Sequence, residues 1–249
     1  MKAVIMAGGR GSRLRKLTTQ RPKPMLPLLN KPVLAHLLNL LKHHQITDVV
    51  ITVRYLAEQI KNYFGDGRDR GMAIQYAIEN SPLGTAGSVK NAESYLGDEP
   101  FLVISGDAIT DFDLSSVLQF HRDKQAAVTM VLKHVADPLE YGVVVTDAGG
   151  RIRHYLEKPD HGQVISNTVN TGIYVLEPEV LAMMKPNEVY DFSYDIFPRL
   201  LSQNIPLFGY LANGYWCDIG TIQRYRQATH DALVGKVKHI DRGSGLVVA

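Results

Sequence analysis

The chain has 249 residues, of which 45% are hydrophobic and 21% charged, as in an ordinary folded globular protein. The net charge of +2 and the aromatic content of 8% do not favour a nucleic-acid-binding surface. The single cysteine, Cys217, excludes an intramolecular disulfide, and no run approaches the roughly 18 apolar residues that span a bilayer. We therefore expect a cytoplasmic protein that binds neither nucleic acid nor membrane; a homo-oligomer is compatible with the sequence.

Strands and helices alternate in the first half of the chain. The apolar run at 2–6 ends at Gly8-Gly9 and predicts a buried strand, and the leucine-rich run after Pro32 predicts a helix. Apolar runs also predict strands at 48–53 and 101–104, and alternation of apolar and polar residues predicts one at 73–78. Helices are expected at 57–64 and 85–96. Such alternation is typical of a parallel sheet with right-handed crossovers.

The second half is richer in strands. After a helix at 113–125 that Asp113 caps, strands are expected at 127–132, 142–146, 152–156 and 172–176, and helices at 178–184, 194–202 and 221–234. We predict an α/β fold, a Rossmann-like three-layer sandwich with a mixed, mainly parallel sheet, in one domain over 1–234. Residues 235–249 form a tail whose apolar end either docks on this domain or begins a further C-terminal module.

A glycine-rich loop, Gly8-Gly9-Arg10-Gly11-Ser12-Arg13, follows the first strand. Glycines at a strand–helix junction let backbone N–H groups approach a phosphate, and arginine adds a bidentate charge. Leu14 replaces the third glycine of the dinucleotide fingerprint, and the Gly-Lys-Ser/Thr of a P-loop is absent. The alternative is a glycine turn with solvated arginines. Next in the chain, Pro22 and Pro24 stiffen the backbone around Lys23, which suits a lysine aimed at a phosphate.

Two aspartates are candidate metal ligands. Asp107 follows a buried strand, at the sheet edge where α/β proteins bind ligands, and Mg²⁺ commonly takes one or two carboxylates plus phosphate oxygens. Asp218 precedes the last predicted helix, so a helix N-cap is its alternative role. A turn cap is the alternative for Asp107. Cys217 has no recognisable base partner and is interpreted as a small packed residue.

Together these stretches resemble the signature of sugar-1-phosphate nucleotidyltransferases, and most closely the mannose-1-phosphate guanylyltransferases. The matching motifs are Ala-Gly-Gly-x-Gly-x-Arg-Leu at 7–14, Pro-Lys-Pro at 22–24, Leu-Gly-Thr-Ala-Gly at 83–87 and Trp-x-Asp-Ile-Gly at 216–220. Lys16 is a departure, because family members usually have proline there. The resemblance implies the nucleotide-diphospho-sugar transferase type of fold, catalytic roles for Arg13 and Lys23, and Mg²⁺ on Asp107 and Asp218.

The resemblance also implies where the substrates bind. The nucleotide would contact the two glycine loops, at Ala7, Gly8, Gly9, Gly11, Ser12, Glu79, Pro82, Gly84 and Thr85. A carboxylate at position 79 matches the two adjacent donors of guanine better than the single donor of uracil, which favours GTP; a solvated glutamate is the alternative. In the Glu157-Lys158-Pro159 motif, Lys158 would hold the sugar phosphate. The sugar would contact Tyr141, Gly142, Glu157, Asn170 and Thr171.

The expected substrates are thus an NTP and a sugar 1-phosphate, with GTP and mannose 1-phosphate favoured, and the expected products are a nucleotide-sugar and pyrophosphate. One alternative is the same chemistry with UTP or ATP and glucose 1-phosphate. Another is a catalytically silent regulatory subunit that binds nucleotide-sugar, although such a subunit should lack Arg13, Lys23, Asp107 or Asp218. A general nucleotide-binding module would leave the Glu-Lys-Pro motif unexplained.

Overall fold

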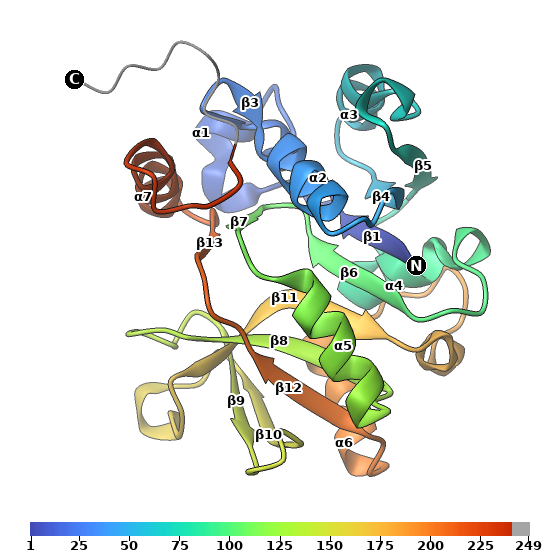
Figure 1. Ribbon diagram of the computed structural model, residues 1–249, viewed down its shortest axis with the longest axis vertical. Coiled ribbons are helices and arrows are strands. Elements are labelled where there is room, and N and C mark those ends of the chain that lie inside the picture. Colours follow the sequence, from blue (N-terminus) through green and yellow to red (C-terminus); the bar gives the residue numbers. More distant parts are fainter. Residues whose placement is uncertain (241–249) are drawn as a thin grey trace.

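Strand β1 (Lys2–Met6) lies in the middle of the main sheet of the computed structural model, which describes residues 1–240 (Figure 1). It pairs in parallel with β4 (Asp48–Val53) and β6 (Phe101–Ser105), and β5 (Ala73–Ile78) continues the parallel set beyond β4. All four strands are predicted from the sequence, β1, β4 and β6 from apolar runs and β5 from its alternation.

The second half extends the same sheet from β6. Strand β11 (Thr168–Leu176) pairs antiparallel with β6 and with β8 (Val128–His134), and β9 (Gly142–Thr146) forms a hairpin with β10 (Ile152–Glu157) beside it. Strand β12 (Leu207–Leu211) pairs in parallel with β8. The sheet is therefore mixed, as predicted.

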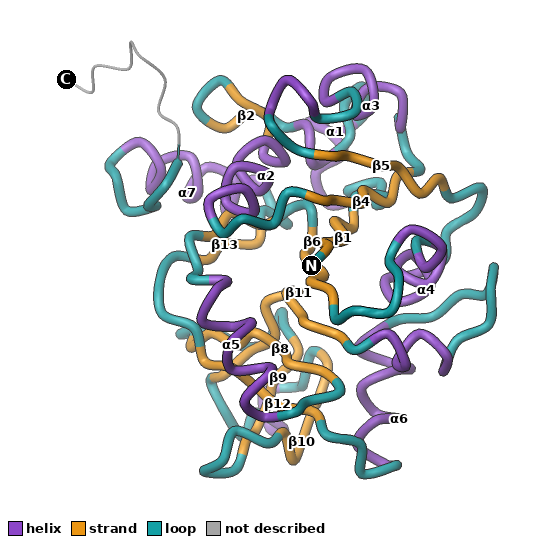
Figure 2. The backbone as a smooth tube through the Cα atoms, turned by 45° about the vertical axis from the view of Figure 1, so that its right-hand side comes forward, coloured by secondary structure: helices purple, strands orange, loops and turns teal. Residues whose placement is uncertain are grey.

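Helices cover both faces of this sheet. Helices α2 (Val33–His43), α3 (Ala57–Phe64) and α5 (Leu114–Lys124) lie on one face, and α4 (Gly84–Asn91) and α6 (Phe197–Ser202) lie on the other (Figure 2). Alternate residues of β1 enter different cores, with Ile5 packed among α2 and α3 residues and Val4 among α4 and α6 residues. This alternation follows from the two-residue repeat of a strand and confirms the three-layer sandwich.

A third apolar cluster lies beneath the glycine loop. Helix α7 (Ile222–Leu233) contributes Ala228 and Ala232, and the short strands β7 (Ala108–Thr110) and β13 (Trp216–Asp218) contribute Ile109 and Cys217. Cys217 is buried there, which confirms its packing role. The cluster supports α1 (Arg15–Thr18) and the small hairpin of β2 (Pro27–Leu28) and β3 (Lys31–Pro32) through Leu14, Leu26 and Leu28.

Some expected helices differ in kind from the prediction. Residues 178–184 were expected to be α-helical, but Pro178–Met183 form a 3-10 helix. The expected helix at 194–202 is a π-turn at Phe192–Ile196 followed by α6, in which Pro198 occupies the second position. Proline lacks the N–H that would continue the hydrogen bonding of a preceding helix, so the break falls just before it.

The chain after α7 begins by packing on the domain. Val237 is buried in the third cluster, and the Lys238 backbone N–H donates to Asp111 Oδ2 at 2.8 Å. The remainder of the predicted tail, 241–249, lies outside the described residues. Within residues 1–240, no helix combines the length and the apolar character needed to cross a membrane.

Candidate active site

A cavity of about 420 Å³ opens at the carboxyl ends of the parallel strands. Arg13, Lys23 and Asp107 line it, together with all of the predicted nucleotide-binding residues. These are Ala7, Gly8, Gly9, Gly11 and Ser12 on the first loop and Glu79, Pro82, Gly84 and Thr85 on the loop after β5. Parallel strands place their following loops at one edge of the sheet, which is why segments distant in sequence meet here.

Lys23 is the central cation of the cavity and is only 7% exposed. Its Nζ lies 2.5 Å from Asp107 Oδ2 and 3.5 Å from Asp218 Oδ1. Burial by itself would lower the pKa of Lys23, but the two carboxylates hold it above its usual value. The ammonium therefore stays charged and ties both predicted metal ligands to one point.

The two aspartates differ in their electrostatic balance. Burial opposes ionisation of Asp107, yet contact with Lys23 and a 2.6 Å hydrogen bond from Ser105 hold the pKa of Asp107 below its usual range. Burial and the nearby Asp107 raise the pKa of Asp218.

The N-cap role for Asp218 is wrong, because Thr221 caps α7. The N-cap role of Asp113 on α5 is confirmed.

Two carboxylates converging on one cation suit a magnesium ion, which prefers hard oxygen ligands and completes its shell with phosphate oxygens and water. The donor chemistry of Asp107 and Asp218 thus fits the group that the sequence motifs imply.

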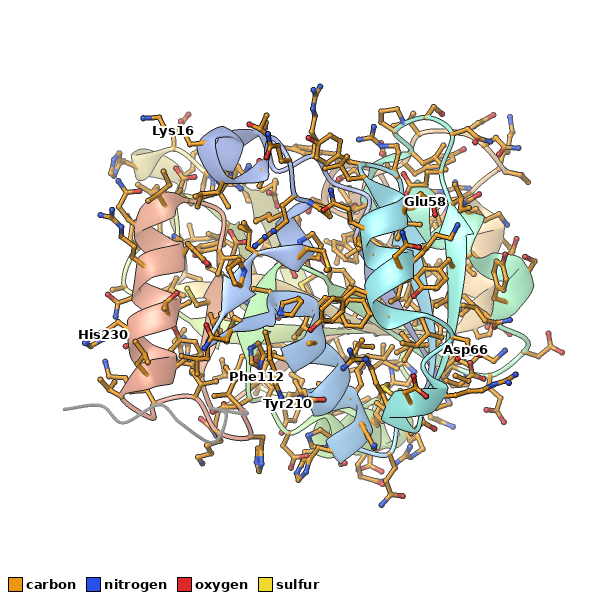
Figure 3. All side chains as sticks on the ribbon, turned by 90° about the horizontal axis from the view of Figure 1, so that it is seen from above. Lys16, Glu58, Asp66, Phe112, Tyr210 and His230 are labelled. Carbon is orange, nitrogen blue, oxygen red and sulfur yellow. The ribbon has the colours of Figure 1, made fainter. Side chains whose placement is uncertain are left out.

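Arg13 lies on the rim of the cavity and is half-exposed. Its Nη1 is 3.8 Å from Glu140 Oε2, an ion pair that spans from the glycine loop to the turn before β9. Lys16, one helical turn away in α1, is exposed at the periphery of the molecule (Figure 3).

Glu79 supplies the carboxylate of the predicted base-binding loop and is buried, with 7% exposure. Its Oε1 accepts a 2.5 Å hydrogen bond from Ser88 Oγ, and burial raises the pKa of Glu79. A side chain at Gly8 would come within 2.8 Å of this oxygen, so glycine at position 8 makes room for the carboxylate. Since a carboxylate has lone pairs for about four hydrogen bonds, capacity remains for a ligand.

The predicted sugar residues form a second group, outside the cavity lining, on β9, β10 and β11. Gly142 opposes Glu157 in the β9–β10 pair, and Asn170 follows the point where β11 meets β9. Asn170 Nδ2 donates to Tyr174 Oη at 2.9 Å. Thr171 does not join them, because it is buried and its hydroxyl donates to Val131 O at 2.7 Å.

Two residues that the sequence predicts to contact the sugar 1-phosphate have unusual local environments. Among the described residues, the Tyr141 hydroxyl is buried without a hydrogen-bond partner, and burial raises the pKa of Tyr141 to about 12. Lys158 is exposed and adopts a left-handed backbone with φ of 45°. Both features cost free energy, and such costs concentrate at functional sites.

Two further charged residues, Arg54 and Asp191, line the cavity, and the sequence motifs do not include them. Arg54 directly follows β4, so its place at the ligand-binding edge of a parallel strand is a usable signal. Asp191 gives no such signal, because it is 106 residues from Thr85, whose hydroxyl donates to it at 3.0 Å.

Comparison with known proteins identifies relatives of similar sequence and fold. A uridylyltransferase from Synechocystis, UTP--glucose-1-phosphate uridylyltransferase, is 38% identical over 96% of the chain, and a mannose-1-phosphate guanylyltransferase from Mycobacterium tuberculosis is 35% identical over 94%. The chain spans 65% of the length of each relative. A solved Bacillus anthracis protein described as a glucose-1-phosphate thymidylyltransferase superposes with a TM-score of 0.86 at 27% identity, covering 98% of both chains.

That superposition confirms the predicted nucleotide-diphospho-sugar transferase type of fold. The model of the nucleotidyl transferase family matches residues 2–234, nearly the whole described chain. This chain belongs to the nucleotidyl transferase family.

Proposed function

We propose that the protein transfers a nucleotidyl group from an NTP to a sugar 1-phosphate and releases pyrophosphate. The observation that carries this proposal is the ion-pair cluster in which both Asp107 and Asp218 contact Lys23. Lys23 and Asp107 line the same cavity as the glycine loop. Membership of the nucleotidyl transferase family supports it.

Each residue has a distinct part in the proposed reaction. A sugar-phosphate oxygen attacks the α-phosphorus of the NTP, the P–O bond to the β-phosphate breaks, and pyrophosphate leaves. Arg13 and Lys23 neutralise the triphosphate, and Lys158 holds the incoming phosphate against charge repulsion. The phosphate nucleophile is already ionised, so no general base is required. Mg²⁺ held by Asp107 and Asp218 would supply charge stabilisation to the phosphate oxygens.

Glu79 supports GTP as the favoured nucleotide. Its carboxylate lines the cavity and can accept from both N1–H and N2–H₂ of guanine, whereas uracil presents one donor between acceptors. The M. tuberculosis guanylyltransferase supports mannose 1-phosphate as the paired sugar. The 38% identity to the Synechocystis uridylyltransferase favours UTP and glucose 1-phosphate as the second candidate pair.

Pyrophosphate release with Mg²⁺ across a grid of NTPs and sugar 1-phosphates tests the proposal. Release with GTP and mannose 1-phosphate alone is the expected result. Release with UTP and glucose 1-phosphate would keep the reaction and discard the specificity. A folded protein that releases no pyrophosphate with any pair would contradict the reaction and favour a regulatory subunit.

Glu79→Gln tests the base argument separately. This change should lower kcat/KM for GTP by roughly tenfold relative to UTP, as expected for one lost charge-assisted hydrogen bond. Glu58→Gln, on the outer surface of α3 (Figure 3), is the matched control and should leave the ratio unchanged. Because burial raises the pKa of Glu79, the GTP preference should also weaken at mildly acidic pH, where this carboxylate begins to take up a proton. An unaltered GTP:UTP ratio in Glu79→Gln would assign Glu79 a structural role.

A further inference from the structure

The hydroxyl of Tyr155, two residues before Glu157 on β10, contacts Glu157 and two other polar side chains. Its Oη lies 2.6 Å from Glu157 Oε2, 2.7 Å from Ser193 Oγ and 3.4 Å from Asn170 Nδ2. The tyrosine is absent from the family motifs in this sequence, and its ring packs against Phe197 at 5.4 Å.

The direction of these hydrogen bonds follows from the groups involved. Burial, with the neighbouring Tyr174 and Glu157, raises the pKa of Tyr155 far above its usual value, so the phenol keeps its proton. A phenol has one proton to donate, and the carboxylate is the strongest acceptor within reach. Tyr155 therefore donates to Glu157, while Ser193 and Asn170 donate to Tyr155.

Gly142 gives independent support for the importance of this contact. A side chain at position 142 would collide with Tyr155 Oη and would come within 2.8 Å of Glu157 Oε2. The glycine opposite Glu157 thus leaves the space that the tyrosine–carboxylate pair fills.

Ser193 connects the pair to the nucleotide cavity. Its backbone N–H donates to Asp191 Oδ1 at 2.8 Å, and Asp191 Oδ2 accepts from Thr85 Oγ1 at 3.0 Å. Thr85 lies on the predicted base-binding loop, and both it and Asp191 line the cavity. Tyr155 is consequently held from the nucleotide side while it holds Glu157.

We propose that Tyr155 is a positioning residue of the sugar site, which fixes the Glu157 carboxylate in the orientation that receives the sugar hydroxyls. This inference rests on the proposed function, since it takes Glu157 as a sugar ligand. It predicts that loss of the Tyr155 hydroxyl weakens sugar 1-phosphate binding and leaves nucleotide binding nearly intact.

The test is steady-state kinetics of Tyr155→Phe, which keeps the ring and removes only the hydroxyl. The KM for the sugar 1-phosphate should rise roughly tenfold, as expected for loss of one hydrogen bond to a charged group, while the KM for the NTP changes little. The matched control is Tyr76→Phe, which removes a hydroxyl bonded to Gly65 O, on a strand remote from the sugar residues. It should leave both constants unchanged.

A double-mutant cycle with Glu157→Gln separates positioning from a general packing role. If Tyr155 acts through Glu157, Tyr155→Phe should change the sugar KM less than twofold in the Glu157→Gln background. An equal tenfold rise in both backgrounds, or a parallel rise in the NTP KM, would contradict a positioning role.

The outcomes distinguish the inference from the function. An active wild type with an unchanged sugar KM in Tyr155→Phe would overturn the role of Tyr155 and leave the proposed function standing. A wild type without pyrophosphate release would overturn the proposed function and the role of Tyr155 together.

Discussion

Lys23 is a buried cation that two carboxylates balance, and this local charge arrangement makes Asp107 the most sensitive position of the candidate site. Asp107→Asn removes one of the two negative charges while keeping the shape of the side chain. We expect kcat to fall roughly 10²- to 10³-fold, comparable to the loss of one preorganised electrostatic contact in other enzymes. Pyrophosphate release with saturating substrates measures the change.

Asp113→Asn is the control for this substitution. It makes the same chemical change at the N-cap of α5, where asparagine caps as well as aspartate, so activity and folding should both persist. Wild-type turnover in Asp107→Asn would contradict the placement of the reaction at Lys23, Asp107 and Asp218.

At the same scale, the sequence predicts the residue types of the site better than their individual partners. Strand–loop patterns identify Lys23, Glu79 and Asp107, because each follows an apolar strand or lies in a proline- or glycine-rich loop. They do not reveal that Ser88 bonds to Glu79, since Ser88 lies within α4 and carries no local signal. Side-chain partners depend on the packing of elements, which a local pattern does not contain.

The loop before α4 and the segment before α6 form one unit at the scale of elements. The backbone N–H groups of Ala86 and Gly87 both donate to Tyr190 O, and the Tyr190 N–H donates to Leu83 O at 3.0 Å. Gly84 adopts φ of 76°, and any side chain there would collide with the Tyr190 carbonyl. The close approach of these two segments therefore depends on glycine.

Gly84→Ala should lower the free energy of unfolding by about 1–3 kcal/mol, because it adds a left-handed non-glycine residue and a backbone collision. Urea unfolding followed by circular dichroism measures this. Gly9→Ala is the matched control, since a Cβ at position 9 meets nothing within 4 Å, and its effect should stay within about 0.5 kcal/mol. Equal stability of the two variants would show that the loop before α4 and the segment before α6 can move apart without lowering the free energy of unfolding.

The elements that sequence patterns miss are short or interrupted. Strands β7 and β13 have three residues each, too few for a two-residue alternation to be recognised, and β12 carries Gly209 at its centre. Each is fixed by its partner strand, Cys217 opposite Ile109 and Gly209 opposite Met130. Long apolar strands with glycine ends are predictable, whereas these three depend on the assembled sheet.

At the scale of the whole molecule, the two halves of the chain share one sheet through the β6–β11 pair and contribute to one site. The first half supplies the two predicted nucleotide-binding loops and Asp107, and the second supplies Asp218, Asp191 and the predicted sugar-binding residues. Substrate binding should therefore depend on the stability of both halves, which couples activity to conditions that destabilise the core.

Acid is such a condition, because His121 is buried where α5 meets the second half of the sheet. Its Nδ1 is 2.9 Å from Thr129 Oγ1 and its Nε2 is 3.2 Å from Glu177 Oε1, and it is 1% exposed. Burial lowers the pKa of His121 despite the attraction of Glu177. Below the ordinary histidine pKa of about 6.5, the unfolded chain binds a proton at His121 that the folded chain does not, so stability falls as the pH falls.

Between about pH 6.5 and the lowered folded-state pKa of His121, we expect the free energy of unfolding to depend on pH partly through this histidine. Its contribution should be at most about 1.4 kcal/mol per pH unit. His121→Gln should be less stable at neutral pH and should lose that part of the slope. His154→Gln, at an exposed position of β10, should retain the wild-type slope. Urea unfolding at several pH values from 7.5 to 5.0 measures all three proteins, and parallel curves for wild type and His121→Gln would place the acid sensitivity at other groups.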